Sequence, residues 1–275
     1  MAAAQSRLGM DARYFQIAAL FTLLLLSNFW SDFGSGLASF ACAVAGCWGG
    51  QWLWAKLRGE AFDWRSPLIT SCSLALLMRA GSPLWFGVAG ALAMSVKAWI
   101  RVGGKHLFNP ANSAIVALLL LSDRIWITPG QWGHVAWIAG VMIGFAALVL
   151  SRAGRLDVAL AFTASYAACL LGRALYLGDP LSIPFHQLQN GSLIVFTCFM
   201  ITDPRSTANH RFGRLLFAAL VAIAALLLQM KLQLVGAPLY ALALLSPLTP
   251  VIDWLFRANR FEWIPTRGVR REEMA

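Results

Sequence analysis

Residues 213–230 of this chain read GRLLFAALVAIAALLLQM. Arg214 is the only charged residue of the stretch, and fourteen consecutive apolar residues follow it. A helix of about 20 mostly apolar residues crosses the hydrocarbon core of a bilayer, so the stretch predicts a transmembrane helix. Lipid offers no hydrogen-bond partner to a bare backbone, and the run does not alternate in polarity, which excludes a strand of a membrane barrel.

The same character recurs along nearly the whole chain. The sequence has 275 residues, of which 59% are hydrophobic and 12% charged, whereas soluble domains average about 25% charged residues. We therefore predict an all-α polytopic membrane protein with about ten transmembrane helices. Residues 1–275 are expected to form a single membrane domain whose spans lie within 14–256, followed by a basic cytoplasmic tail at 257–275. The expected spans are 14–31, 36–55, 66–82, 84–101, 110–122, 132–151, 156–177, 187–202, 213–230 and 235–256.

The basic residues test this arrangement, because cytoplasmic loops of membrane proteins carry an excess of Lys and Arg. With ten spans, eighteen of the 22 Lys and Arg residues fall on one side, the side of both termini. We therefore expect a multi-pass protein of a bacterial inner membrane with its N- and C-termini in the cytoplasm. The net charge of +10 is then an orientation signal, and no nucleic-acid partner is expected. The basic tail is either part of that signal or a docking segment for a partner or for anionic lipid.

The ends of the chain and its cysteines have plain interpretations. No small-residue cleavage site clearly follows the first apolar run, so we expect a retained helix rather than a removed signal. The five cysteines lie in apolar runs without a C-x-x-C pair. They are better interpreted as small buried side chains than as ligands of an iron–sulfur cluster. The four histidines lie in or near predicted loops, which argues against a transmembrane haem. We expect neither a catalytic residue nor a metal site.

One stretch carries more chemical information than the rest. Residues 97–121 read KAWIRVGGKHLFNPANSAIVALLLL. Asn is a favoured N-cap and Pro a favoured first helical residue, so a helix is predicted to start at Asn109 and Pro110, near the cytoplasmic face. The free N–H groups of a helix start suit an electron-rich or anionic group, such as a phosphate or the pyrimidine edge of a flavin.

The polar residues of this helix start are spaced for joint use. His106, Asn109 and Asn112 lie three residues apart and can share one side. The Asn side chain offers both a donor and an acceptor, as recognition of an imide requires. The plainer alternative is a capped helix start with incidental polar neighbours.

A second stretch predicts another helix boundary on the same side. Residues 199–214 read FMITDPRSTANHRFGR, and the residue before a proline avoids helical geometry, so a helix should end near Thr202 and Asp203. Asp203 is expected either to cap the turn or to pair with Arg205 or Arg211. Together, the two boundaries predict a polar pocket on the cytoplasmic side.

Three further charged residues interrupt apolar runs. Asp253, within SPLTPVIDWLFR (246–257), is costly at membrane depth and so is a candidate for function. Pairing with Arg257 four residues later is the plainer role. Arg79 and Arg173 either reach to the outer surface or line a polar cavity.

These stretches, in this order, resemble the RnfD/NqrB family. It contains one membrane protein of the Rnf-type electron-transport complexes and one of the sodium-translocating NADH:quinone reductase. The resemblance covers roughly residues 66–257. It is carried by PLITSCSLALL (67–77), PLWFGVAGALAMSVK (83–97), GGKHLFNPA (103–111), FMITDP (199–204) and PVID (250–253).

The resemblance implies a fold of two inverted repeats, similar in architecture to urea transporters, and a place among the membrane subunits of an electron-transport complex. It implies a non-covalent flavin, riboflavin or FMN, near the F-N-P-A helix start. The candidate cofactor-binding residues are then Asn109, His106, Asn112, Thr202 and Asp203. At the position of His106 the family usually has Asn.

A second flavin of the family is an FMN joined covalently to the Thr of an S-G-A-T-like motif in the outer loop after that helix. Here the loop reads SDRIWITPGQWG (122–133), with Thr128 but no S-x-A-T. We therefore expect no covalent FMN.

Three functions follow for testing. The first is a redox subunit that relays electrons through a bound flavin, with a coupled movement of ions. The second is a solute transporter or channel of urea-transporter-like fold, since half-helix ends are shared with solute carriers. The third is a non-catalytic membrane scaffold for partner subunits.

Overall fold

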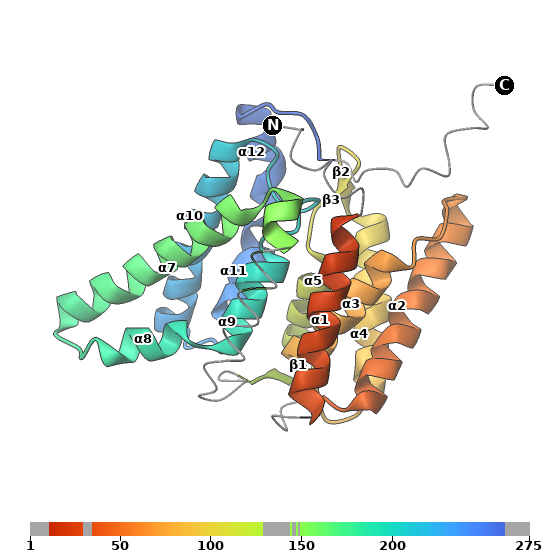
Figure 1. Ribbon diagram of the computed structural model, residues 1–275, viewed down its shortest axis with the longest axis horizontal. Coiled ribbons are helices and arrows are strands. Elements are labelled where there is room, and N and C mark those ends of the chain that lie inside the picture. The colour runs from red at the N-terminus through yellow and green to blue at the C-terminus, as the bar shows by residue number, and fades with distance from the viewer. Residues whose placement is uncertain (1–10, 30–34, 129–143, 145–146, 148, 262–275) are drawn as a thin grey trace.

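The computed structural model describes residues 11–29, 35–128, 144, 147 and 149–261. Within them the chain is mostly helical, and the helices form two groups side by side (Figure 1). One group comes from residues 12–121 and the other from residues 156–255.

The first group contains five helices, and backbone contact holds two of them together. Its helices are α1 (Ala12–Phe29), α2 (Leu37–Arg58), α3 (Arg65–Leu77), α4 (Leu84–Trp99) and α5 (Pro110–Leu121). Helix α2 packs along α4, and α1 along α3. A Cβ atom added to Gly46 of α2 would lie 2.1 Å from the carbonyl oxygen of Gly87 in α4. Glycine therefore lets the two helices touch at closest approach.

The second group is more interrupted. Its elements are α7 (Leu156–Leu177), α8 (Ser182–Leu188), α9 (Gly191–Val195), the π-helix η2 (Phe196–Met200), α10 (Arg211–Lys231), α11 (Ala237–Leu245), the 3₁₀-helix η3 (Ser246–Leu248) and α12 (Thr249–Leu255). Helix α10 packs against α7 and α11. The two groups meet where α5 contacts α11 and where α3 contacts α9.

The fold is mostly helical, as predicted, and two short strand pairs interrupt the helices. Strand β1 (Met78–Ala80) pairs antiparallel with β4 (Ile125–Ile127), and β2 (Arg101–Val102) with β3 (Lys105–His106). The predicted span 66–82 is therefore too long: helix α3 ends at Leu77, and Met78 turns extended, with ψ 147°. Its backbone groups find partners in β4 rather than in another helical turn, which closes the end of the bundle.

The helices bear out a multi-pass membrane protein. Among the described residues, four helical segments are long and apolar enough to cross a bilayer: α1, α7, α10 and residues 237–255. No more than a third of the most apolar window in each is buried, so most of this apolar surface faces outward, as contact with lipid requires.

The count of ten spans stays a prediction. The predicted span 132–151 lies largely outside the described residues, as does most of the predicted tail. The predicted span 187–202 is divided, since α8 ends at Leu188 and Asn190 caps the new helix α9. The last predicted span is also interrupted, by η3 at Ser246.

Candidate functional site

The two proline-marked helix boundaries meet at one end of the bundle. Asn109 caps α5, with its side-chain oxygen accepting a hydrogen bond from the N–H of Asn112 at 3.1 Å. Its amide nitrogen donates to the carbonyl of Met200, the last residue of η2, at 3.3 Å. The π-helix therefore ends directly against the start of α5. Single π turns are frequent at functional sites.

The second bridge between the boundaries is a buried contact between an imidazole and a carboxylate. Nε2 of His106 lies 3.1 Å from Oδ2 of Asp203, with 8% and 17% of the two side chains exposed. Oδ1 of Asp203 accepts the backbone N–H of Arg205, and Oδ2 accepts the hydroxyl of Ser206, both at 3.1 Å. Asp203 thus accepts hydrogen bonds within its own turn and also contacts His106 in the β2–β3 hairpin.

The charge of Asp203 follows from these contacts. Burial raises the pKa of the carboxyl, but the charge and hydrogen bond of His106 oppose it. With the bonds from Arg205 and Ser206, they bring the pKa of Asp203 down to about 2. The carboxylate is therefore ionised at neutral pH.

Asp253, from the third sequence motif, is connected to the same cluster of polar contacts through Lys105. Nζ of Lys105 donates to Oδ2 of Asp253 at 3.0 Å and to the carbonyl of Thr207 at 2.6 Å. Burial lowers the pKa of Lys105, against the opposing pull of Asp253. Asp253 also accepts the backbone N–H of Asn209 at 2.7 Å. The hairpin β2–β3, the loop after η2 and α12 are thereby bound together. The structure gives Asp253 the partner Lys105 in place of the expected Arg257.

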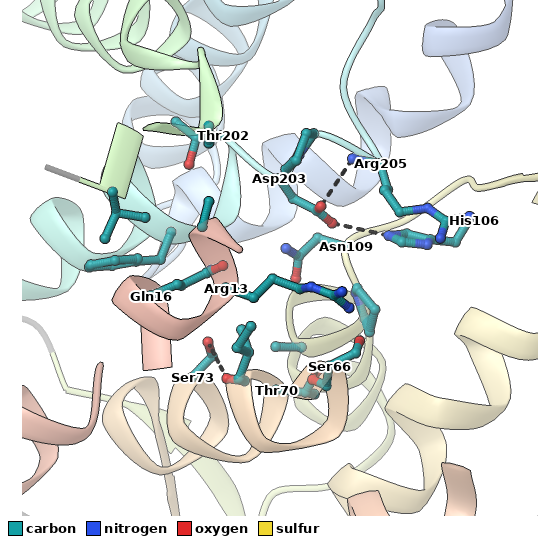
Figure 2. A pocket seen from close by; sticks show the side chains of 18 of the residues that line it. Arg13, Gln16, Ser66, Thr70, Ser73, His106, Asn109, Thr202, Asp203 and Arg205 are labelled. Atoms are coloured by element: carbon teal, nitrogen blue, oxygen red, sulfur yellow. Dashed lines mark hydrogen bonds and ion pairs between the residues drawn. The ribbon is translucent and has the colours of Figure 1, made fainter. Parts of the chain in front are cut away.

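A polar cleft with a volume of about 120 Å³ lies beside this cluster of polar contacts. His106, Asn109, Thr202 and Asp203 line one wall (Figure 2). The facing wall comes from the first helices of the chain. Its polar members are Arg13, Gln16, Asp63, Ser66, Thr70, Ser73 and Lys97.

The structure thus brings four of the five predicted residues to one cleft and leaves Asn112 outside its lining. Asn112 is 1% exposed, and its amide donates to the carbonyl of Leu239 in α11 at 3.1 Å. Its role is to tie α5 to α11 and to offer the N–H that Asn109 caps.

The facing wall was missed by sequence reasoning, although a signal for it exists. Ser66, Thr70 and Ser73 are spaced by four and three residues in α3, so they share one helix face, and Figure 2 shows them on the cleft. The hydroxyls of Thr70 and Ser73 donate to the carbonyls of Ser66 and Ile69. Their oxygens therefore keep lone pairs for a ligand.

Charged groups on the facing wall are held by neighbours. Arg13 pairs with Asp11 at 2.6 Å and also bonds Asp63. Lys97 donates to Ser66 at 2.7 Å and to Gln51 at 3.1 Å. Both walls of the cleft therefore carry charges of both signs, with Arg13, Lys97 and Asp63 on one and Asp203 with Arg205 on the other. Among the described residues, no cluster of three or more His, Cys, Asp or Glu side chains is arranged to hold a metal ion.

Comparison with known proteins matches the chain to one family. The model of the "NQR2, RnfD, RnfE family" matches residues 120–262, which is more than half of the chain. Several curated proteins named as the D-type subunit of an ion-translocating oxidoreductase complex are similar. One from Escherichia coli O1:K1 is 32% identical over 130 residues, and one from Citrobacter koseri is 30% identical over 128 residues. Each match covers 46% of this chain and 35% of the relative.

The matched part is thus about a third of the length of these curated relatives. The family match nevertheless takes in the T-D-P boundary, α10, α11 and Asp253. We conclude that the chain belongs to the NQR2, RnfD, RnfE family, whose curated relatives are named as subunits of ion-translocating oxidoreductase complexes.

Proposed function

We propose that this chain is a membrane subunit of an electron-transport complex and relays electrons through a non-covalently bound flavin, riboflavin or FMN, in the polar cleft. Coupled ion translocation and partner subunits in the membrane belong to the same proposal, as do a bacterial inner-membrane location and cytoplasmic termini. The observation that carries it is the meeting of Asn109 and Asp203 at one cleft in a member of this family.

The donors of the cleft fit the pyrimidine edge of a flavin, which carries two carbonyls and an N–H between them. Asn109 uses one N–H for Met200 and keeps the other for a carbonyl. The lone pairs of Thr70 and Ser73 are available to the imide N–H. Lys97, which is hydrogen-bonded to the neutral side chains of Ser66 and Gln51, would favour negative charge on the ring. When bound, a flavin would supply the electron-accepting chemistry, and the protein its position and electrostatics.

The volume of the cleft limits how the ring would lie. A cavity of about 150 Å³ holds one benzene ring, so a space of about 120 Å³ suits at most one ring of the three in isoalloxazine. We place the pyrimidine ring inside and the rest of the cofactor toward the open mouth. Asp203 and His106 would then set the polarity of the mouth beside Arg205.

The arrangement of helix starts supports two inverted repeats. Asn109 caps α5, and Asn190 caps α9 by accepting the N–H of Ser192 at 2.9 Å. The two helices begin at opposite ends of the bundle (Figure 1). A capped half-helix in each half, with reversed direction, is the pattern of inverted-repeat transporters. We propose ten spans on this basis.

The test is the colour and redox behaviour of the purified protein. We expect an absorbance band near ~450 nm, set by the ring, that bleaches on addition of dithionite. Acid precipitation should release all of the flavin, because Thr128 stands outside any S-x-A-T motif. Flavin fluorescence retained by the denatured chain would contradict the non-covalent part. A colourless protein that passes small solutes into liposomes would replace the redox function with transport.

A further inference from the structure

Arginines from distant parts of the chain converge on the turn of the β2–β3 hairpin. Gly103 and Gly104 form this turn with φ of 56° and 74°, a conformation that glycine adopts without strain. Nη1 of Arg260 donates to the carbonyl of Gly103 at 3.1 Å, and its Nη2 donates to that of Gly104. Nη2 of Arg205 donates to the same carbonyl of Gly104 at 3.3 Å. Two guanidinium groups therefore share one oxygen atom.

The partners of these arginines leave most of the positive charge uncompensated. Arg205 and Arg260 bind carbonyl oxygens of the turn, which carry no formal charge. Arg101, the first residue of β2, pairs with Glu60 at 3.0 Å. The same carboxylate oxygen of Glu60 lies 3.8 Å from Arg58. One acidic side chain thus serves two arginines at this edge of the cluster.

The surroundings of Arg205 show that the positive charges act on one another. Burial lowers the pKa of its guanidinium, the carboxylate of Asp203 raises it, and the charges of Arg260 and Arg101 lower it further. Its Nε atom is buried without a hydrogen-bond partner among the described residues. An anion beside Arg205 would offset the repulsion and offer acceptors to the guanidinium.

The free donors of the cluster match a phosphate group. A guanidinium has five N–H donors in a planar fork that binds two phosphate oxygens at once. Within the described part of the chain, Arg260 uses one N–H of each Nη atom and Arg205 one N–H of Nη2. Donors therefore remain on both side chains. A phosphate ester has three strong acceptor oxygens and up to two negative charges, enough for two guanidinium groups held at one carbonyl.

The position of the cluster gives a phosphate group two possible sources. Arg205 lines the polar cleft beside His106 (Figure 2). Immediately before Arg101, Trp99 and Ile100 at the end of α4 are 66% and 40% exposed. Exposed tryptophan is typical of the membrane interface, where lipid headgroups lie. Either a ligand whose ring enters the cleft or a lipid headgroup can therefore bring the phosphate.

We propose that Arg101, Arg205 and Arg260 form a binding site for a phosphate group at the turn of the β2–β3 hairpin. The two guanidinium groups held at Gly104 bind the phosphate oxygens, and Arg101 adds positive charge. The site does not require a flavin in the cleft. Only the part of the test that uses a flavin rests on the proposed function.

The test compares probes with and without the phosphate. The detergent-solubilised full chain is first dialysed free of exchangeable ligands, at low ionic strength, because salt screens exposed charges. FMN and riboflavin, which differ by one phosphate ester, are compared by equilibrium dialysis. Dioleoylphosphatidylglycerol and dioleoylglycerol in mixed micelles are compared by the lipid retained on immobilised protein. We expect the phosphate-bearing member of at least one pair to bind about tenfold more tightly.

Variants assign this preference to the cluster. Arg205→Gln and Arg260→Gln each remove one guanidinium and should reduce the preference for the phosphate-bearing probe about tenfold. Arg260→Lys keeps the charge without the planar fork and should reduce it less. Arg211→Gln is the matched control, because the side chain of Arg211 is 70% exposed and lies 4.0 Å from its partner Asp157. This control should leave binding unchanged.

The outcomes separate the two sources. A preference for FMN that is lost in the Arg205 and Arg260 variants supports a site for the phosphate of a cleft ligand. A preference confined to the lipid pair, and lost in the same variants, supports a site for a lipid headgroup. The inference is overturned if neither pair shows a preference, if the preference survives in both variants, or if Arg211→Gln reduces it equally.

Failure of this inference is distinguishable from failure of the proposed function. Equal binding of FMN and riboflavin, without a lipid preference, would overturn the phosphate site and leave the flavin proposal standing. A chain that binds neither flavin but retains phosphatidylglycerol through Arg260 would do the reverse, because it would support the phosphate site and contradict the flavin proposal.

Discussion

The imidazole of His106 lies 3.1 Å from the carboxylate of Asp203, 97 residues further along the chain. This pair joins a hairpin of the first helix group to a loop of the second. Both side chains are largely buried, and each follows or precedes a proline-marked helix boundary. The pair therefore fixes the two segments that together form one wall of the polar cleft.

The pair predicts a specific response to acid. The pKa of Asp203 is lowered from 3.8 to about 2 in the folded protein, so its ionisation stabilises the fold above pH 3.8 and this contribution is lost as the pH falls toward 2. His106→Ala removes the largest of the interactions that oppose the effect of burial on Asp203. The pKa of Asp203 should therefore rise. Because the pKa then lies closer to its value in the unfolded chain, thermal unfolding followed by circular dichroism from pH 7 to 3 should show a lower melting temperature at pH 7 and a smaller further loss of stability on acidification. An unchanged profile would contradict a stabilising role for the pair.

Asn109 is expected to serve both the helix and the cofactor, and two substitutions separate these roles. Asn109→Leu removes the cap, at about 1 kcal/mol of stability, and also the amide donor. Asn109→Ser keeps a capping oxygen but lacks the amide. Flavin content per purified chain, measured by absorbance after acid release, should fall in both variants. Melting temperature should fall mainly in Asn109→Leu. Full flavin retention by both would remove Asn109 from the proposed site.

The ion pair between Lys105 and Asp253 should contribute more to the free energy of unfolding than a surface ion pair does. The two side chains are 12% and 20% exposed and 3.0 Å apart, so Asp253→Asn leaves a buried ammonium without its counter-charge. We expect a loss of about 2–4 kcal/mol of stability.

A double-mutant cycle checks that value. In the Lys105→Met background the same Asp253→Asn change should cost clearly less, since no cation is stranded. Strictly additive effects on the unfolding free energy would show that the two groups do not interact.

Two glycines of α2 form a matched pair for testing the contact with α4. In Gly46→Ala the new Cβ would lie 2.1 Å from the carbonyl oxygen of Gly87, whereas Gly49 has nothing within 4 Å. Gly46→Ala must push the helices apart and should cost about 1–3 kcal/mol. Gly49→Ala should be neutral or slightly stabilising, because alanine favours the helix. Equal melting temperatures for the two variants would contradict the close backbone approach.

The direction of the chain in the membrane is open to a reporter experiment. Alkaline phosphatase is active only outside the cytoplasm, so a fusion after Arg124 should be active and a fusion after Arg257 inactive. A fluorescent-protein fusion at the C-terminus should fluoresce. The opposite pattern would reverse the assignment of cytoplasmic termini that rests on the positive-inside rule.

Helix positions were largely predictable because the constraint on them is local. A bilayer selects long apolar runs, and lipid forces such runs to be helical; α1, α7 and α10 lie within two residues of their predicted bounds. The local cap at Asn109 and the stop before Pro204 were predictable for the same reason, since each depends on two or three neighbouring residues.

Other features depended on contacts between distant segments. The end of α3 at Leu77 is decided by β4, about fifty residues away in the sequence. Nothing local could assign Asp253 to Lys105 rather than Arg257, because both cations are chemically suitable and only the packed hairpin brings Lys105 near. The sequence likewise could not show that the face of α3 with Ser66, Thr70 and Ser73 lines a cleft, because the opposite wall comes from distant segments.

The sequence by itself determined that the chain lies in a membrane as a set of helices, that two helix boundaries carry polar residues, and which family they resemble. The reason is that hydropathy, capping and motif spacing act over a few residues. Only the tertiary structure decided that the boundaries meet at one cleft and that the polar face of α3 lies across from them. Cavities are formed by side chains from elements far apart in the sequence, and their shape is set by how those elements pack.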